Sequence, residues 1–185
     1  TFGHRNKVMA AVGRPVVYRK DPAASESQRV IISAPTPAAG TPTDAIYIGI
    51  PSGDGQTLAD SCNWNLIEGL DIKDTVSGIK GLHIQCSAYN TYAKSKIYCT
   101  LGTGAIGAIV TGTSARQAKY NIIQNNEIYN TPYQGILLGF TTNATANNHS
   151  HFNHVIDNNF YLSGTGALAR FDNAVKVQAL NKSNV

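Results

Sequence analysis

Five short segments of the chain carry a distinctive residue between two apolar neighbours. Tyr47, His83 and Lys176 take this position in three segments, and Gln85 and Gln178 follow two residues after His83 and Lys176. Alternate residues of a β-strand point to opposite faces, and neighbouring strands lie about 4.8 Å apart. If the segments are adjacent strands, these side chains line one outward face. A phenol, an imidazole, an amine and two amides at that spacing suit sugar units, so we predict a carbohydrate-binding strip; a solvated sheet face is the alternative.

The five segments recur along the chain. Aligned on their first apolar residue, they begin at Ile46, Leu82, Ala108, Ile136 and Val175, at intervals of 36, 26, 28 and 39 residues. A short strand with one apolar face cannot bury that face alone, whereas stacked coils bury a continuous core and place length differences in the corners. Like strands of successive coils would then pair in parallel. Ile109 and Leu137 share the strip position, which indicates that something covers part of the strip.

A second repeat precedes three of these segments and predicts an internal asparagine ladder. The phrase Ile122-Ile123-x-x-Asn126-x-Ile128 matches Leu66-Ile67-x-x-Leu70-x-Ile72 and Val155-Ile156-x-x-Asn159-x-Tyr161. Asn126 and Asn159 take the same place in this alignment. We therefore expect their side chains to stack inside the molecule in adjacent coils, with each amide hydrogen-bonded to the next.

These repeats predict an all-β fold: a right-handed, single-stranded parallel β-helix of about five coils. Residues 1–185 would form one domain, with residues 1–29 as a starting coil. Antiparallel hairpins are the competing interpretation, but they need two-residue turns, and Asp54-Gly55 is the only such pair. Capping boxes and helical periodicity are missing. Asn184-Val185 repeats Asn121-Ile122 where the sequence stops, so we expect a second copy or a further chain to cover an open C-terminal coil.

Two stretches of the sequence resemble a known family. NIIQNNEIYNTPYQGILLG and HVIDNNFYLSGTGALARFDNAVKVQ are similar to coils of right-handed parallel β-helix proteins of the pectate-lyase-like superfamily, and the resemblance covers about residues 30–185. It implies a polysaccharide lyase that cleaves an anionic, uronic-acid polysaccharide by β-elimination. This reaction needs neutralisation of the carboxylate, a base for the C5 proton and an acid for the leaving oxygen.

The resemblance also implies roles for residues near the end of the sequence. Lys176 is the candidate base, Lys182 is the second candidate, and Arg170 would bind the substrate carboxylate. Asp172 would bind a Ca²⁺ ion, and Asn173 beside it would contact the substrate. No other cofactor is expected.

The sequence departs from this family in its carboxylates. It has only 11 acidic residues and no aspartate cluster, and the paired-aspartate and His-Gly motifs of polygalacturonases are missing. Glycosidase chemistry needs two facing carboxylates, and no obvious pair is present. The alternative function is therefore a non-enzymatic β-helix: a polysaccharide-binding, adhesin, spike or filament-forming module.

Composition limits the partners and the location. The formal charge is +4, yet 14% of residues are charged and no basic run is present, which argues against a nucleic-acid surface. No apolar run is long enough to span a membrane. Few charges and many small polar residues favour a secreted or cell-surface protein.

Two sets of side chains, the cysteines and a group of histidines, each have two possible interpretations. Cys86 and Cys99 flank a polar loop and could be bridged, with Cys62 left over; three free thiols are the equal alternative. His149, His151 and His154 have a spacing that can hold zinc, although a polar loop is the preferred interpretation.

Overall fold

The computed structural model describes residues 6–8, 17–21, 23, 30–33, 44–49, 62–74, 80–99, 106–112, 117–131, 134–139, 150–162 and 173–177. Within these ranges all regular structure is β-strand, and every strand pair is parallel. The strands form three long sheets and one short sheet. The prediction of an all-β parallel fold is therefore confirmed.

Each long sheet takes one strand from every turn of the chain. Sheet A contains β1 (Asn6–Val8), β4 (Asp44–Gly49), β7 (Lys80–Gln85), β10 (Ile106–Thr111), β14 (Gln134–Leu138) and β18 (Asn173–Val177). Sheet B contains β2 (Val17–Arg19), β5 (Leu66–Glu68), β8 (Thr91–Ala93), β12 (Ile122–Gln124) and β16 (His154–Ile156). Sheet C contains β3 (Val30–Ser33), β6 (Leu70–Asp74), β9 (Lys96–Cys99), β13 (Glu127–Tyr129) and β17 (Asn159–Tyr161). The short sheet D pairs β11 (Ala118–Lys119) with β15 (Ser150–His151).

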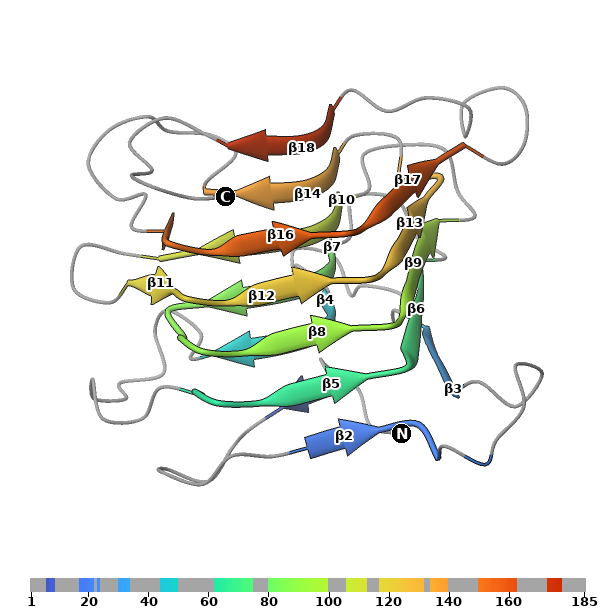
Figure 1. The fold of residues 1–185 in the computed structure, drawn as a ribbon, viewed down its shortest axis with the longest axis horizontal. Coiled ribbons are helices and arrows are strands. Elements are labelled where there is room, and N and C mark those ends of the chain that lie inside the picture. The colour runs from blue at the N-terminus through green and yellow to red at the C-terminus, as the bar shows by residue number, and fades with distance from the viewer. Residues whose placement is uncertain are drawn as a thin grey trace, which may run out of the picture.

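The chain winds through these sheets as a parallel β-helix. It passes from sheet B to sheet C and then to sheet A, and the next turn begins again in sheet B. In Figure 1 the strands of sheet B run across the front, sheet C turns away at the right, and sheet A returns behind them. Because the turns climb from the N-terminal to the C-terminal strands in this sense, the helix is right-handed.

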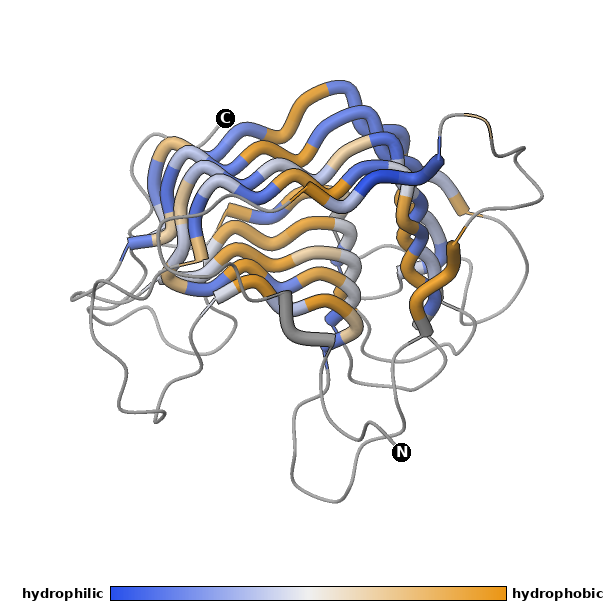
Figure 2. Tube along the Cα trace, turned by 90° about the horizontal axis from the view of Figure 1, so that it is seen from below, coloured by the Kyte–Doolittle hydropathy of each residue, from blue (hydrophilic) through white to orange (hydrophobic). Residues whose placement is uncertain are grey.

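The interior consists of apolar columns that run from coil to coil. Ile67, Tyr92 and Ile123 form the column of sheet B, and Ile72, Ile97 and Ile128 form that of sheet C; all six are buried. Figure 2 shows the corresponding hydrophobic segments at the same place in successive coils. Since each coil supplies one side chain to each column, the core is continuous although no single coil could bury its own apolar face.

The register of sheet A agrees with the sequence alignment. Its pairs join Ile46 to Leu82, Leu82 to Ala108, Ala108 to Ile136 and Ile136 to Val175. The inward side chains at β18 are more exposed than those before it: Val177 is 52% exposed, whereas Leu138 beside it is 1% exposed. Coverage of this end by another chain or copy stays a prediction.

Glycine is required where the strands of sheet A bend. A Cβ atom on Gly81, Gly107 or Gly135 would lie 2.5–2.6 Å from the carbonyl oxygen of the residue beside it in the following strand. Real Cβ atoms do not approach so closely, so a larger residue would push adjacent coils apart. These glycines therefore set how tightly successive coils stack.

The predicted pairing of Asn126 with Asn159 is wrong by one residue. Asn126 donates a hydrogen bond from Nδ2 to Oδ1 of Asn158 at 2.9 Å, and Asn159 pairs with Glu127 instead. The alignment failed because it matched pairs of apolar residues without considering which residue of each pair points into the core. Ile123 and Val155 are partners, whereas Ile156 is 39% exposed and does not belong to the core.

Neither Cys62 nor Cys86 is in a disulfide, and both are buried. The bridge between Cys86 and Cys99 is therefore not formed.

Candidate functional site

The predicted carbohydrate strip forms one row on the outer face of sheet A, but its residues from Tyr47 to Leu137 are buried. Tyr47, His83, Ile109, Leu137 and Lys176 are successive partners, as the alignment predicted. Tyr47 is 1% exposed, Ile109 3% and Leu137 0%, and the last two pack with Ile106 in an apolar cluster. The strip is therefore not open along this part of the row, because these side chains are buried in the structure.

A buried hydrogen-bonded chain crosses three strands on this face. Nδ1 of His83 on β7 lies 3.0 Å from Oδ2 of Asp44 on β4, and Nε2 lies 3.0 Å from Oγ1 of Thr111 on β10. The carboxylate can only accept, so Nδ1 donates to it; Nε2 accepts from the threonine hydroxyl when the imidazole is neutral and donates to it when the imidazole is protonated. Tyr47 lies edge-on to His83, at 5.1 Å between ring centroids, and donates to Oε1 of Gln85.

This acid–imidazole–hydroxyl order resembles that of nucleophilic enzymes, but its burial fits a structural role. Asp44 is 2% exposed, Thr111 1% and His83 7%. A nucleophile needs room for a reacting carbon about 3 Å away, and these atoms face other protein atoms. The hydrogen bonds of His83 with Asp44 and Thr111 instead join β4, β7 and β10. Direct contact of Tyr47, His83 or Gln85 with a saccharide stays a prediction.

The other predicted site residues are only partly placed. Lys176 lies on β18 beside Leu137 and is partly exposed, and the backbone of Asn173 pairs with Gln134. Arg170, Asp172, Gln178, Lys182 and His149 lie outside the described residues. In the described part of the chain, no three His, Cys, Asp or Glu side chains gather so that they could hold a metal ion.

The most exposed group of large side chains with a regular arrangement lies where the chain enters sheet B. Trp64, Tyr89, Tyr120 and Phe152 stack from coil to coil; we call this group the aromatic row. Their ring centroids lie 4.1, 5.2 and 5.3 Å apart, and the planes differ by 4°, 15° and 10°. The four side chains are 59%, 39%, 39% and 43% exposed. The row therefore forms a continuous aromatic surface across four coils.

An internal asparagine ladder positions the aromatic row. Each ring residue is followed by a buried asparagine: Asn65, Asn90, Asn121 and Asn153. Nδ2 of each asparagine donates to Oδ1 of the next, at 2.8, 3.0 and 2.9 Å, and the backbone N–H of each donates to the same oxygen at 3.0 Å. Buried amides paired in this way hold the bends in line, so the rings before them also lie in line.

The backbone of every ring residue is left-handed. The φ angles of Trp64, Tyr89, Tyr120 and Phe152 are 64°, 58°, 55° and 52°. This conformation costs an L-residue about 1–2 kcal/mol and is uncommon for bulky side chains. The bend between sheets B and C has the same conformation at Gly69, Lys94, Asn125 and Asp157, none of which is aromatic. The bend itself therefore does not require rings.

Basic side chains border the aromatic row. Nζ of Lys119 lies 5.9 Å from the centroid of the Tyr120 ring, and the ring of His151 lies 6.2 Å from that of Phe152. Lys119 and His151 are partners in sheet D, and Ala88 bridges to Lys119 in the coil before. The Lys119 amine and the His151 imidazole thus lie on the same side of the row.

A second aromatic stack lies on the outer face of sheet C and is less exposed. Tyr98, Tyr129 and Tyr161 stack at 5.0 and 4.7 Å. Burial is the main cause that raises the pKa of each phenol, and for Tyr161 the hydrogen bond from its hydroxyl to Glu127 adds to it, so that the pKa is about 12. These hydroxyls therefore stay protonated at neutral pH.

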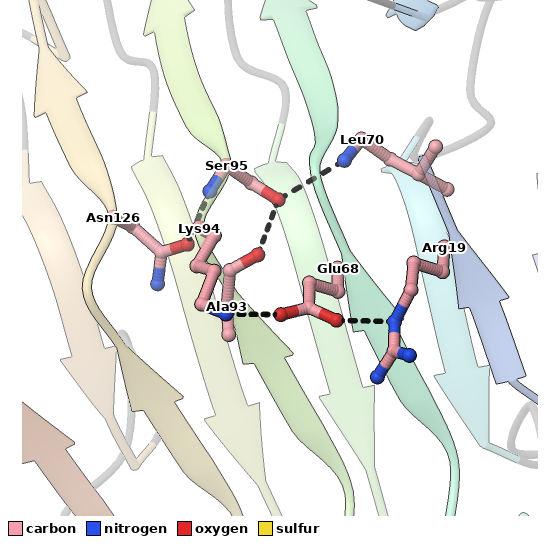
Figure 3. A network of polar contacts seen from close by, with 7 residues as sticks. All are labelled: Arg19, Glu68, Leu70, Ala93, Lys94, Ser95 and Asn126. Atoms are coloured by element: carbon pink, nitrogen blue, oxygen red, sulfur yellow. Dashed lines mark hydrogen bonds and ion pairs between the residues drawn. The ribbon is translucent and has the colours of Figure 1, made fainter. Parts of the chain in front are cut away.

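Polar contacts also support the bend between sheets B and C (Figure 3). Glu68 pairs with Lys94 at 2.7 Å and with Arg19, and the hydrogen bond from Lys94 is the largest cause that lowers the pKa of Glu68. Behind this pair, Oγ of Ser95 accepts from the backbone of Leu70, and the backbone N–H of Ser95 donates to Asn126. The contacts join adjacent coils on the outside and the inside of the same bend.

The sequence contained a signal for the aromatic row that our alignment did not use. An aromatic residue directly followed by asparagine occurs at positions 64–65, 89–90, 120–121 and 152–153, and once outside the row, at positions 129–130. We aligned apolar residues, and so this repeat of ring and amide was missed.

The sheets and columns together define a single-stranded parallel β-helix. Comparison with known proteins adds no closer identification: no family model, no characterised protein and no solved structure shows significant similarity to the chain. Among the described residues, no helix has the length and apolarity that crossing a membrane requires.

Proposed function

We propose that this β-helix is a polysaccharide-binding module of the cell exterior and that the aromatic row is its binding surface. The observation that supports this most directly is the exposure of four large rings at positions where the backbone does not favour them. Exposed aromatic patches of this kind mark interaction sites. Stacking between the rings recovers part of the backbone cost, but it does not account for leaving their outer edges in solvent.

A linear polymer suits the shape of the row. The rings recur once per coil along the helix axis, so a ligand with one repeating unit can meet them in succession. Tyr89 and Tyr120 add hydroxyl groups that can hydrogen-bond sugar oxygens, and tyrosine combines a large contact area with a polar end. The resemblance to pectate-lyase-like proteins supports the same class of ligand.

Native electrophoresis in gels that contain a polysaccharide would test the proposal. We expect pectate, alginate, chondroitin sulfate or a soluble cellulose ether to retard the protein, and Tyr120→Gly to reduce the retardation. Asn125→Gly is the matched control, because Asn125 lies in the same coil and has the same left-handed backbone at the other bend. Glycine adopts this backbone freely, so both variants should fold. Equal retardation of Tyr120→Gly and the unchanged protein would contradict the proposal.

Polysaccharide lyase activity is a second candidate function, supported by the position of Lys176. This amine lies on the outer face of sheet A, next to Leu137 at the C-terminal end of the predicted carbohydrate strip. It is partly exposed, so a substrate carbon could reach it. The test is the ultraviolet absorbance of the unsaturated product from pectate, alginate or chondroitin sulfate, with and without Ca²⁺. Lys176→Gln should abolish any such activity if Lys176 is the base.

A further inference from the structure

The aromatic row presents ring edges rather than ring faces to solvent. Each of its three contacts is a parallel stack with planes within 15° of one another, so Tyr89 and Tyr120 have a ring against both faces. Because both faces of these two rings are stacked, a ligand would meet mainly the rim of each ring. A saccharide therefore cannot lay its C–H face flat on these two tyrosines.

Ring edges have an electrostatic preference. The quadrupole of an aromatic ring is negative on the face and positive at the edge. Four aligned edges, together with the hydroxyl hydrogens of Tyr89 and Tyr120, thus form a strip of weak positive potential. This strip favours oxygen-rich or anionic groups over the C–H groups of a neutral sugar.

The formal charge beside the row is that of Lys119, and it is positive. Lys119 and His151 lie on one side, and the nearest outward positions on the other side are Leu66, Thr91, Ile122 and His154. No carboxylate occurs at these flanking positions within the described residues. The nearest described acidic groups in sheet B and its bends are Glu68, which is paired with Arg19 and Lys94, and Asp157, which lies beyond the following strand.

From this geometry we infer that the aromatic row selects an anionic polysaccharide, whose carboxylate or sulfate groups meet the ring edges and Lys119 while the polymer runs along the helix axis. This inference rests on the proposed function and specifies its ligand class. Lys119 supplies the strongest charge because its amine is held against the Tyr120 ring, in the middle of the row. His151 is next to Phe152, at the C-terminal end.

Pectate and its fully methyl-esterified form test the inference, because they share a backbone and differ in charge. Calorimetric titration should give pectate an affinity at least about tenfold higher than the ester at low salt, with the difference shrinking as salt rises. Lys119→Gln should weaken pectate binding and leave ester binding unchanged, and Lys119→Arg should retain pectate binding. Lys73→Gln, a charge change on the outer face of sheet C, is the control that should leave both affinities unchanged.

The outcomes separate this inference from the proposed function. If pectate and its ester bind equally well and Tyr120→Gly weakens both, the ligand class is wrong while the binding surface stands. If Lys119→Gln and Lys73→Gln weaken pectate binding equally, general charge attraction replaces the site. If neither polymer binds, nor alginate, chondroitin sulfate or the cellulose ether, the proposed function itself is overturned.

Discussion

Nδ2 of Asn121 lies 2.9 Å from Oδ1 of Asn153, although the two residues are 32 positions apart in the sequence. The same amide also donates to the carbonyl oxygen of Ser87, and its own Oδ1 accepts two hydrogen bonds from Asn90. One side chain therefore connects three successive coils. Because this side chain is buried, the groups that form hydrogen bonds with it would have neither a protein partner nor water in its place.

We predict that Asn121→Ala destabilises the fold by roughly 3–6 kcal/mol, since it leaves two donors of Asn90 unpaired in the interior at about 1–3 kcal/mol each and opens a small cavity. Denaturant titration followed by circular dichroism measures this. Asn125→Gly, at the neighbouring solvent-exposed bend, should change the free energy of unfolding by less than about 1 kcal/mol. Similar losses for the two variants would show that the ladder contributes no special stability.

Gly107→Ala should destabilise the fold by more than about 3 kcal/mol or prevent folding, because its Cβ would lie 2.5 Å from the carbonyl oxygen of Gly135. Ala174, beside Gly135 on the last described strand, gives the control: Ala174→Gly should cost only about 1 kcal/mol or less. Soluble yield and thermal denaturation compare the two variants. A Gly107→Ala protein with an unchanged melting temperature would mean that the coils can separate to admit the methyl group.

The stability of the protein should fall at alkaline pH, and Tyr161 should contribute to this. Its pKa is raised to about 12 in the fold, above the value of about 10 in an unfolded chain. The neutral phenol therefore contributes stability fully below about pH 10, and that contribution is lost as the pH rises toward 12. Tyr161→Phe keeps the aromatic stack and removes this titration, so its melting temperature should fall less steeply above pH 10. An identical slope would assign the effect to Tyr98 and Tyr129 alone.

Glu68 should link stability to acid pH with the opposite sign. Its pKa is lowered, first by the hydrogen bond from Lys94 and further by Arg19, with burial opposing. The charged form is favoured in the fold, so its contribution is present above the unfolded pKa of about 4.3 and is lost as the pH falls below it. Glu68→Gln should cost less than about 1 kcal/mol at neutral pH, because Arg19 and Lys94 are exposed, and still less at pH 3. A cost that is the same at both pH values would exclude the ion pairs as its cause.

The register of sheet A could be predicted from the sequence. The register of sheet B could not, because the sequence did not show which apolar residues point inward. In sheet A, alternation around Tyr47, His83 and Lys176 gave the register correctly, because a slip of one residue would turn every apolar side chain outward. In the three-residue strands of sheet B, Ile122 and Ile156 face outward, so apolar character alone did not identify the inner column.

The candidate site was harder to predict than the fold. Alternation identified the outer face of sheet A, yet it could not reveal that Tyr47 and Leu137 are covered, because coverage depends on distant parts of the chain. The link from His83 to Asp44 and Thr111 runs diagonally across three strands and leaves no mark in any one of them. The aromatic row was detectable in principle, since Trp64 and Tyr89 each precede an asparagine.

The spacing of the aromatic row is independent of how long each coil is. Eight residues separate each ring from the inward residue of sheet C that follows it: Trp64 from Ile72, Tyr89 from Ile97, Tyr120 from Ile128 and Phe152 from Phe160. All variation in coil length therefore falls between this residue of sheet C and the next ring, in the corners before and after sheet A. The spacing between successive rings of the aromatic row is therefore set by strand pairing alone. Duplicating one coil should add one ring to the aromatic row. The length of the row can therefore change by gain or loss of whole coils, while the spacing between its rings stays constant.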